Sequence, residues 1–431
     1  MSDADPQNAE RDPARRALPQ LGVAPGPKDV AAPAPTAAEA FRLARPGTSR
    51  VRGLYVHVPF CFHKCHYCDF YSFVDQEDRQ PAYVARLLGE ADRARELGAI
   101  DAPLETIFVG GGTPTFLRPP LLQELLSGLA RRLPLAPAAS GLEWTVEANP
   151  ETVTEEVAAI LVACGVNRVS LGAQSFHPDL LATLERWHDP ASVARAVGHL
   201  RCAGIRRINL DLIFGIPGGT LAAWESDLDQ ALALGPEHLS CYGLTYEPNT
   251  ALTKRLELRQ VEPCDEDLEA AMYETTLDRL EAAGFHGYEI SNFAKPGEAC
   301  RHNLLYWTNA DWWALGPSAS AHVQGIRWKN VPRLGTWLAS EASGERASPV
   351  VDVEQVDAST RAGELLMLGL RLREGMAGAD VEACCIGPEA AARRRAIDAA
   401  IARGLLETVD GRLRFTRSGL LLADEVLSEL V

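Results

Sequence analysis

Short apolar runs alternate with longer amphipathic stretches between Leu54 and about residue 250. Six of the runs have the length and the branched side chains of buried strands: LYVHV, TIFVGGG, LEWTVEANP, NRVSLGAQS, RINLDLIFGIP and HLSCYGLT. The stretches between them, such as PAYVARLLGEADRAREL, PPLLQELLSGLARRL and VTEEVAAILVACG, have the periodicity of helices. Repetition of strand and helix predicts parallel strands joined by crossover helices. We therefore expect an α/β fold with an incomplete (β/α)6 TIM-like barrel, and a doubly wound sheet is the alternative.

The segments outside this repeat predict further parts of the chain. Residues 1–50 are rich in Ala and Pro and lack a sustained apolar period, so we expect a disordered tail. The barrel is expected over 51–300 and an aromatic-rich connecting region over 301–350. Residues 351–431 contain helical patterns and a hairpin that turns at Asp410-Gly411, a pair that favours the type I′ turn. This combination predicts a smaller C-terminal α+β, winged-helix-like domain with a lid or interaction role.

Polar or glycine-rich residues follow the predicted strands. A cysteine-containing loop follows the first strand and Gly110–Pro114 the second, while Glu147 ends the third. The fourth strand leads to Gln174, and the fifth contains Asp211. The carboxyl ends of parallel barrel strands meet at one mouth, where active sites of this architecture lie. One end of the barrel is therefore expected to hold the site.

The loop after the first strand, CFHKCHYC, places Cys61, Cys65 and Cys68 at the spacing C-x3-C-x2-C. Three thiolates can each bind one iron of a [4Fe-4S] cluster and leave the fourth iron open. An open iron suits a small molecule that binds it directly and receives an electron, as S-adenosylmethionine does. A structural zinc site is the alternative, and it would need a fourth ligand. That ligand would have to be His57, His63, His66 or a remote group.

Composition and charge narrow the range of partners. The 431 residues carry a formal net charge of -16, which argues against a partner bound through phosphates, so we expect no nucleic-acid partner. No run of about 18 uninterrupted apolar residues occurs, so we do not expect an integral membrane protein. The N-terminal sequence MSDADPQNAERDPARRALPQ is acidic without an apolar segment, which is typical of neither a signal nor a transit peptide. A cytoplasmic location is expected, and in a reducing compartment a tight cysteine cluster indicates metal binding.

The cysteine spacing, the aromatic Tyr67 before the last cysteine and the segment GGGTPT resemble the radical S-adenosylmethionine superfamily. YVHVPFC, VEANP, SLGAQSF, NLDLIFGIPGGT and HLSCYGLTYEP, in this order, resemble the coproporphyrinogen III oxidase-like group within it. The resemblance covers residues 51 to about 430. It implies a [4Fe-4S] cluster on the three cysteines and reductive cleavage of S-adenosylmethionine to methionine and a 5′-deoxyadenosyl radical.

The resemblance also implies residues that bind S-adenosylmethionine, but no catalytic side chain. Backbone groups of Gly111, Gly112 and Thr113 would approach its methionine end. Carboxylates of Glu147 and Asp211 suit its amino group and ribose hydroxyls, while Gln174 and Arg186 can bind its polar groups. Tyr55 and Tyr67 would pack near the cofactor and its adenine. Arg186, within LLATLERWHD, could equally be a surface arginine of a helix.

Two features separate the branches of the group. The cysteine pattern of the oxidases resembles C-x3-C-x2-C-x-C, whereas in this sequence Phe70 occupies the position of the fourth cysteine. RHNLLYW resembles H-N-L-x-Y-W, the signature of the HemW-like branch of heme chaperones. That resemblance implies heme binding, transient contact with a heme-accepting respiratory membrane protein and an electron donor such as flavodoxin or ferredoxin. The alternative is an oxygen-independent oxidase that converts two propionates of coproporphyrinogen III to vinyl groups.

Residues 302–337 are unusually aromatic and contain five of the eight tryptophans. A flat apolar macrocycle needs aromatic walls and an axial histidine. The match to the branch signature makes His302 the expected heme ligand. The alternative is a tryptophan-rich domain junction in which His302 only makes hydrogen bonds.

Overall fold

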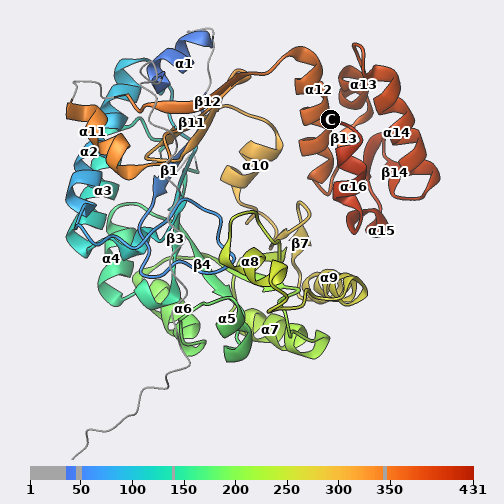
Figure 1. Ribbon diagram of the computed structural model, residues 1–431, viewed down its shortest axis with the longest axis horizontal. Coiled ribbons are helices and arrows are strands. Elements are labelled where there is room, and N and C mark those ends of the chain that lie inside the picture. The colour runs from blue at the N-terminus through green and yellow to red at the C-terminus, as the bar shows by residue number, and fades with distance from the viewer. Residues whose placement is uncertain (1–34, 45–50, 138–140, 343–346) are drawn as a thin grey trace, which may run out of the picture. The chain divides into compact units, whose positions relative to one another are not determined.

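A computed structural model of the chain describes residues 35–44, 51–137, 141–342 and 347–431 (Figure 1). The strands form one 12-stranded sheet and one three-stranded sheet within these residues. No helix of the described ranges is long and apolar enough to cross a membrane.

Six parallel strands make up the central part of the large sheet and lie side by side in chain order. They are β1 (Gly53–Val58), β2 (Thr106–Gly111), β3 (Glu143–Ala148), β4 (Arg168–Gln174), β5 (Arg207–Phe214) and β6 (His238–Gly243). The connecting helices are α2 (Gln80–Glu96), α3 (Pro119–Arg132), α4 (Glu155–Ala163), α5 (Pro178–Thr183), α6 (Ala191–Ala203) and α7 (Leu221–Ala233). The six predicted strands and their crossover helices are confirmed. Further strands flank β1 and β6, so the described sheet does not close into a full barrel.

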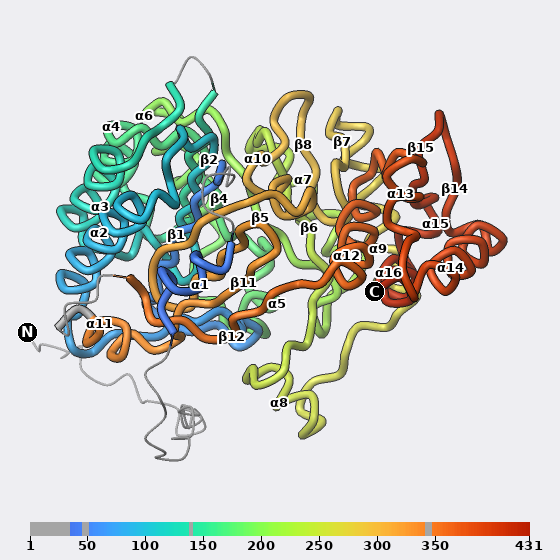
Figure 2. Tube along the Cα trace, turned by 90° about the horizontal axis from the view of Figure 1, so that it is seen from above, coloured from blue at the N-terminus to red at the C-terminus, as the bar shows by residue number. Residues whose placement is uncertain are grey.

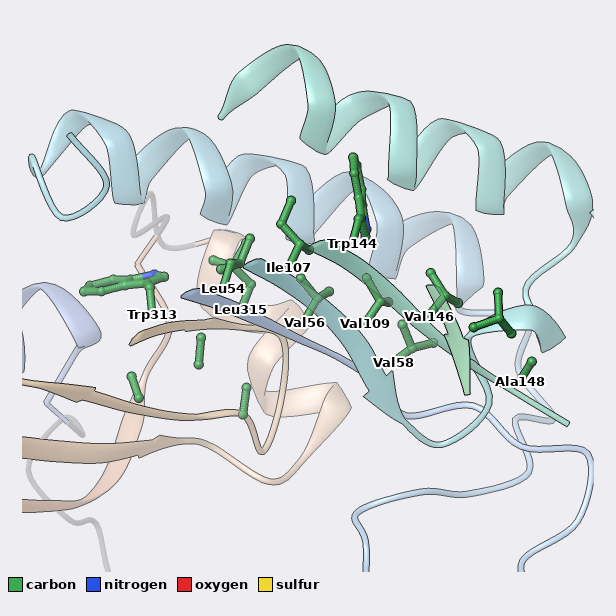
Figure 3. Close-up of a cluster of buried hydrophobic side chains, with 14 of the residues drawn as sticks. Leu54, Val56, Val58, Ile107, Val109, Trp144, Val146, Ala148, Trp313 and Leu315 are labelled. Carbon is green, nitrogen blue, oxygen red and sulfur yellow. The ribbon is translucent and has the colours of Figure 1, made fainter. Parts of the chain in front are cut away.

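Alternate side chains of each central strand point to opposite faces of the sheet. One set is apolar and packs under the helices, as Figure 3 shows for Val56, Ile107 and Val146, all of which are fully buried. The helices approach one another closely, since a Cβ atom at Gly128 of α3 would lie 2.7 Å from the Leu88 side chain of α2. The opposite set of side chains is free to line an interior site.

The region 301–350, expected to be only a connection, extends the sheet beyond β1. Strand β9 (Trp312–Leu315) pairs parallel to β1, with Gly53 opposite Trp312. The strands β10 (Ser320–Val323), β11 (Ile326–Asn330) and β12 (Val350–Gln355) follow as an antiparallel meander. At the other edge, β8 (Asn292–Ala294) runs antiparallel to β6 and pairs with β7 (His286–Gly287).

The expected disordered tail differs from the structure at residues 35–44. Residues 37–43 form helix α1 (Ala37–Leu43), which begins with a capping box between Thr36 and Glu39. Phe41 is buried, and its ring meets the edge of the Trp313 ring with centroids 5.5 Å apart. These apolar contacts explain why the segment folds despite its Ala-rich composition. The rest of the expected tail, residues 1–34 and 45–50, lies outside the described residues.

The C-terminal part has its own three-stranded sheet, in the order β13-β15-β14. Its strands are β13 (Met376–Ala377), β14 (Leu406–Val409) and β15 (Arg412–Phe415), and its helices are α12 (Ala358–Arg371), α13 (Gly378–Cys384), α14 (Ala390–Ala402), α15 (Arg417–Leu420) and α16 (Ala423–Ser428). The predicted hairpin is confirmed, because Asp410 and Gly411 join β14 to β15 with positive φ angles of 51° and 77°.

The remaining helices lie between these parts. They are α8 (Ala251–Glu257), α9 (Glu266–Ala282), α10 (Arg301–Trp307) and α11 (Leu334–Ala342). Figure 2 shows that α8 lies on a long excursion of the chain after β6. The amide of Leu252 in α8 donates a hydrogen bond of 2.8 Å to the carbonyl of His66, so this excursion contacts the cysteine loop.

Candidate functional site

A cavity of about 480 Å³ lies on the face of the central strands that the helices leave free. Its walls include side chains at alternate positions of five strands: Tyr55 and His57, Phe108, Thr145 and Glu147, Ser170, Asn209 and Asp211. Most of these side chains are polar, whereas the opposite face of the same strands is apolar. A cavity with convergent polar groups is the usual form of a small-molecule site.

The cysteine loop lies at one end of this cavity. It leaves β1 and returns at Phe73, whose carbonyl accepts a hydrogen bond of 3.0 Å from the amide of Cys61. Asp69 and Phe70, directly after Cys68, form part of the cavity wall. The expected position of the cysteines beside the mouth of the strands is therefore the position that the chain adopts.

The three thiols lie close enough to influence one another. Burial, together with the nearby Cys65 and Cys61, raises the pKa of Cys68 to about 11. Burial also raises the pKa of Cys61, against the hydrogen bond that links its sulfur to the Thr113 hydroxyl at 3.6 Å. Thiols with raised pKa values are protonated at neutral pH until a bound cation stabilises the thiolate. A metal group bound by these cysteines would therefore have to displace their protons.

A mononuclear zinc site is not supported by this arrangement. No three His, Cys, Asp or Glu side chains of the described ranges converge to hold one metal ion. His57, one possible fourth ligand, has both ring nitrogens bonded, to the Tyr55 hydroxyl at 3.0 Å and to the Tyr71 carbonyl at 2.8 Å. A [4Fe-4S] cluster has a different requirement, because each thiolate binds a separate iron.

Arg186 is half-buried beside the cysteine loop, and its guanidinium contacts the loop. Its guanidinium donates one hydrogen bond to the Cys65 sulfur at 3.5 Å and another to the Gly172 carbonyl at 2.9 Å. A Cβ atom at Gly172 would lie 2.8 Å from Arg186 and 2.9 Å from the Gln174 amide, so glycine makes room for both side chains. Tyr67 lies in the same group, and burial, together with the charge of Cys65, raises its pKa. The structure thus brings Arg186, Gln174 and Tyr67 together.

The glycine-rich segment after β2 runs along the cysteine loop. The amide of Gly112 donates to the Val58 carbonyl at 2.7 Å, and that of Thr113 donates to the Phe60 carbonyl at 2.8 Å. A Cβ atom at Gly112 would lie 2.8 Å from both of these carbonyl oxygens. The absence of a side chain is therefore what allows the two segments to approach.

Two half-buried carboxylates, Glu147 and Asp211, face the cavity without an ion-pair partner among the described residues. Burial raises the pKa of Glu147 to about 7, and the charge of Asp211 adds to this, while the Gly111 amide donates to Glu147 at 3.0 Å and opposes it. Burial also raises the pKa of Asp211, which accepts hydrogen bonds from Ser170 at 3.0 Å and Asn209 at 2.7 Å. Buried carboxylates without a cation are costly. The pair is therefore suited to a ligand with positive charge.

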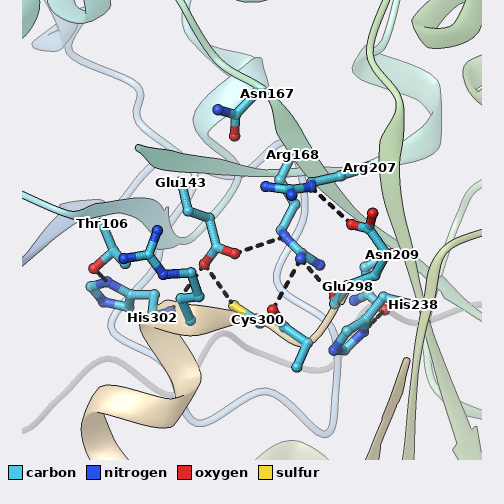
Figure 4. Close-up of polar contacts among 12 residues, drawn as sticks. Thr106, Glu143, Asn167, Arg168, Arg207, Asn209, His238, Glu298, Cys300 and His302 are labelled. Carbon is cyan, nitrogen blue, oxygen red and sulfur yellow. Dashed lines mark hydrogen bonds and ion pairs between the residues drawn. The ribbon is translucent and has the colours of Figure 1, made fainter. Parts of the chain in front are cut away.

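His302 lies in the cavity wall but offers no free ring nitrogen. Its Nδ1 bonds the Thr106 hydroxyl at 2.8 Å (Figure 4). Its Nε2 bonds the Tyr306 hydroxyl at 2.9 Å. Its ring stacks on Phe108 with centroids 5.3 Å apart, and burial lowers its pKa to about 3. An iron could bind His302 only if one of these hydrogen bonds broke, so this geometry corresponds to the alternative of a hydrogen-bonding histidine.

The tryptophans of residues 302–337 do not surround one cavity. Trp313, Trp328 and Trp337 are at most 2% exposed and belong to the hydrophobic core. Trp312 lines the cavity, whereas Trp307 lies under the guanidinium of Arg371, 5.1 Å from its ring. Of the five tryptophans of the expected aromatic wall, Trp312 lines the cavity. Trp313 and Trp328 pack in the sheet extension, and Trp337 packs in α11.

A buried ion pair at the far end of the cavity was missed from the sequence. Glu143 and Arg168 are at most 2% exposed and lie 3.4 Å apart. Arg168 also donates to the Glu298 carbonyl at 2.7 Å, and Glu143 accepts from the His302 amide at 3.0 Å (Figure 4). The pair thereby holds the segment before α10 against the strands. The sequence signal that could have revealed this ion pair is the presence of charged residues at cavity-facing positions of β3 and β4.

Comparison with known proteins relates both the central part and the C-terminal part of the chain to known families. The sequence pattern of the Radical SAM superfamily matches residues 55–231, and that of the HemN C-terminal domain matches residues 356–422. The heme chaperone HemW of Mycobacterium tuberculosis is 38% identical over 386 residues, which cover 88% of this chain and 94% of that protein. The heme chaperone HemW of Bacillus subtilis is 37% identical over 327 residues, with coverages of 76% and 85%.

Among solved structures, the radical SAM enzyme coproporphyrinogen III oxidase (HemN) from Escherichia coli matches with a TM-score of 0.76 and 20% identity. The match covers 88% of this chain and 90% of that chain. It confirms the predicted α/β fold of an incomplete barrel with a smaller C-terminal domain.

Proposed function

This chain belongs to the radical SAM superfamily and, within it, to the family of the heme chaperone HemW; from this premise we propose that it binds a [4Fe-4S] cluster, S-adenosylmethionine and heme and delivers heme to respiratory enzymes. The observation that carries the cofactor part is the arrangement around one cavity, where the cysteine loop, the glycine-rich segment and two half-buried carboxylates without an ion-pair partner meet. The family relationship carries the heme part.

Cys61, Cys65 and Cys68 would hold the cluster. The Arg186 guanidinium donates to the Cys65 sulfur and would stabilise its thiolate form. The Thr113 hydroxyl lies 3.6 Å from the Cys61 sulfur and would donate a hydrogen bond to its thiolate form. These contacts favour the deprotonated thiolates that iron requires.

The residues around the cavity fit S-adenosylmethionine, whose sulfonium and ammonium groups are both cationic. Glu147 and Asp211 supply negative charge on the strands that line the cavity, and Asp69 of the cysteine loop lies in the same wall. Gly111, Gly112 and Thr113 lie between Glu147 and the cysteine loop, where small residues permit close approach. Tyr55, stacked on Phe108 at 6.3 Å, would give a flat surface for adenine. When bound, the cluster and the cofactor supply reductive cleavage of the sulfonium, and the protein orients the cofactor and excludes water.

Two observations favour chaperone activity over the oxidase reaction. Phe70 stands at the fourth cysteine position of the oxidase pattern and is 61% exposed beside the cavity. The HNLLYW segment forms α10, and relatives at 37% and 38% identity are named heme chaperones. The oxidase match is at 20% identity and supports the fold alone. A heme-accepting respiratory membrane protein and a flavodoxin or ferredoxin as electron donor complete the proposal.

The deciding experiment combines turnover with heme binding in cluster-loaded protein under anaerobic conditions. With reductant, S-adenosylmethionine and coproporphyrinogen III, we expect 5′-deoxyadenosine to form without vinyl product. Hemin titration should give a saturable Soret absorbance at one heme per chain. Catalytic accumulation of the vinyl product would instead establish the oxidase activity, and an absence of saturable hemin binding would remove the chaperone function.

A further inference from the structure

An exposed group of aromatic rings lies on the outer side of the cysteine loop. This aromatic patch consists of Phe62, His63, Phe116 and Trp187. Phe62 and Trp187 are 66% and 62% exposed, and the Phe62 ring lies 6.4 Å from Trp187 and 6.3 Å from Phe116. The His63 ring stacks on Trp187 with centroids 4.1 Å apart and an interplanar angle of 14°. Adjacent exposed aromatic rings mark a binding surface in a protein whose core is otherwise well filled.

The imidazole of His63 differs from the best-bonded histidines of the chain. Both ring nitrogens of His57, His238, His302 and His322 have hydrogen-bond partners. The Nε2 atom of His63, Nδ1 of His66 and both ring nitrogens of His188 are buried and have no partner among the described residues. Of these three histidines, His63 is the one that belongs to the aromatic patch. A ring nitrogen without a partner is what an iron porphyrin needs from its axial ligand.

We propose that heme binds on the aromatic patch, with Nε2 of His63 as an axial ligand of the iron. Trp187 and Phe62 would pack against the macrocycle, whose faces are flat and apolar. The next residue, Lys64, is exposed, and its ammonium donates one described hydrogen bond, to the Phe70 carbonyl at 3.3 Å. Its other donors can bind a heme propionate. This inference rests on the proposed function and assigns a place to the heme.

The Trp187 ring covers one face of the His63 ring. Most of the Trp187 side chain is in solvent, and its indole N–H donates to the Glu185 carboxylate at 3.3 Å. A rotation of Trp187 away from His63 would break the stacking contact with His63, the edge contact with Phe62 and this hydrogen bond. Trp187 can then pack against the entering macrocycle instead of the imidazole.

The patch is separate from the cavity proposed for S-adenosylmethionine, since none of its four residues lines that cavity. His63 lies between Cys61 and Cys65 in the chain, and Trp187 follows Arg186, which donates to the Cys65 sulfur. Heme on the patch would lie against the outside of the loop that holds the cluster. A position on the surface also suits a cargo that must pass to another protein.

Hemin titration of the full-length, cluster-loaded protein tests the site, because the loop cysteines are then occupied by iron. His63→Ala should weaken hemin binding by at least about tenfold, the range found even for groups that only support a metal ligand, and should change the Soret maximum. Trp187→Ala should weaken it by a smaller factor without changing the iron ligand. His286→Ala removes an exposed histidine of β7 and should leave the titration unchanged.

The outcomes separate this inference from the proposed function. Unchanged affinity and spectrum in His63→Ala, or loss of binding in His302→Ala with none in His63→Ala, would overturn the patch as the heme site but leave the chaperone function. Failure of the natural protein to bind hemin would overturn both. Iron and sulfide content is measured in each variant, and if His63→Ala loses the cluster, His63→Gln and Trp187→Ala provide the same comparison.

Discussion

Arg186 donates a hydrogen bond to the sulfur of Cys65 across 3.5 Å and so connects the chain after α5 to the cysteine loop. The same guanidinium holds the Gly172 carbonyl at the end of β4. One side chain therefore fixes the position of a thiol relative to a strand of the central sheet. The variants below test this and the other relationships that build the site.

Arg186→Lys should weaken S-adenosylmethionine binding and alter the cluster. A lysine keeps the positive charge but cannot reach both the thiol and the carbonyl with a planar fork. Loss of one charge-assisted hydrogen bond, about 1.5–3 kcal/mol, corresponds to roughly 10- to 100-fold in affinity. Calorimetric titration and the electron paramagnetic resonance spectrum of the reduced cluster provide the measurements. Arg195→Lys, at a half-exposed arginine of α6, is the matched control, and equal effects in the two variants would contradict the assigned role.

Binding of S-adenosylmethionine should depend on the ionisation of Glu147. Its pKa in the folded protein is raised from 4.5 to about 7, so the carboxyl is neutral below pH 7 and loses its attraction for a cation. Affinity should therefore fall by up to about tenfold per pH unit below 7 and level off above it. Titrations between pH 6 and 8 check this, and Glu147→Gln should remove the dependence. Glu124→Gln, at an exposed position of α3, should retain it.

The raised pKa of Glu147 also makes the stability of the folded protein depend on pH. Stability falls as pH rises, whereas the affinity for S-adenosylmethionine rises. The unfolded chain releases the Glu147 proton near pH 4.5, whereas the folded protein keeps it until about pH 7. The free energy of unfolding therefore falls as pH rises across this window, by about 3 kcal/mol in total for this group. In the absence of S-adenosylmethionine, Glu147→Gln should unfold at higher urea concentration than the natural protein at pH 8. A lower midpoint would show that the ionised carboxylate has a stabilising partner.

Gly112→Ala should destabilise the junction between the glycine-rich segment and the cysteine loop. Its Cβ would lie 2.8 Å from two backbone carbonyl oxygens, which cannot move without shifting the loop. We expect a loss of about 1–3 kcal/mol and a lower cluster content. Gly198→Ala in α6 is the control and should stabilise the protein, because no atom lies within 4 Å of its Cβ. Alanine is more favourable than glycine in a helix by about 1 kcal/mol. Urea unfolding and iron analysis compare the two.

Cys61→Ala, Cys65→Ala or Cys68→Ala should each abolish the brown absorbance of the cluster after anaerobic reconstitution. Three thiolates are the minimum for a cluster with one open iron, and no other described cysteine lies on this loop. Cys202→Ala, at an exposed cysteine of α6, should keep the full iron and sulfide content. A loop variant that retained all its iron would contradict the assignment.

The sequence contained enough information for the central strands and for the residues at their ends. Short apolar runs between amphipathic stretches predicted six strands, and the parallel arrangement brought Glu147, Asp211 and the cysteine loop to one cavity. The environment of Arg186 was not predictable, because its burial depends on contacts with Cys65 and Gly172, which are distant in the chain.

The partners of His302 could not be foreseen for a similar reason. Thr106 lies 196 residues away and saturates Nδ1, while Tyr306 saturates Nε2 from the same helix. The tryptophans were misplaced because aromatic content is the same for a ligand wall and for a core. Whether Trp313 belongs to a ligand wall or to the core is decided by the pairing of β9 with β1. The two strands are far apart in the sequence, so their pairing leaves no local sequence pattern.

The parallel pairing of β9 with β1 has a consequence for biosynthesis. Gly53 lies opposite Trp312, so one edge of β1 lacks its partner until residues 312–315 leave the ribosome. At 5–20 residues per second, the interval lasts roughly 10 to 50 s. The nascent chain carries an open strand edge next to three reduced thiols during this time, and such edges recruit other strands. Completion of the sheet beside the cysteine loop therefore depends on residues that are synthesised about 250 positions later.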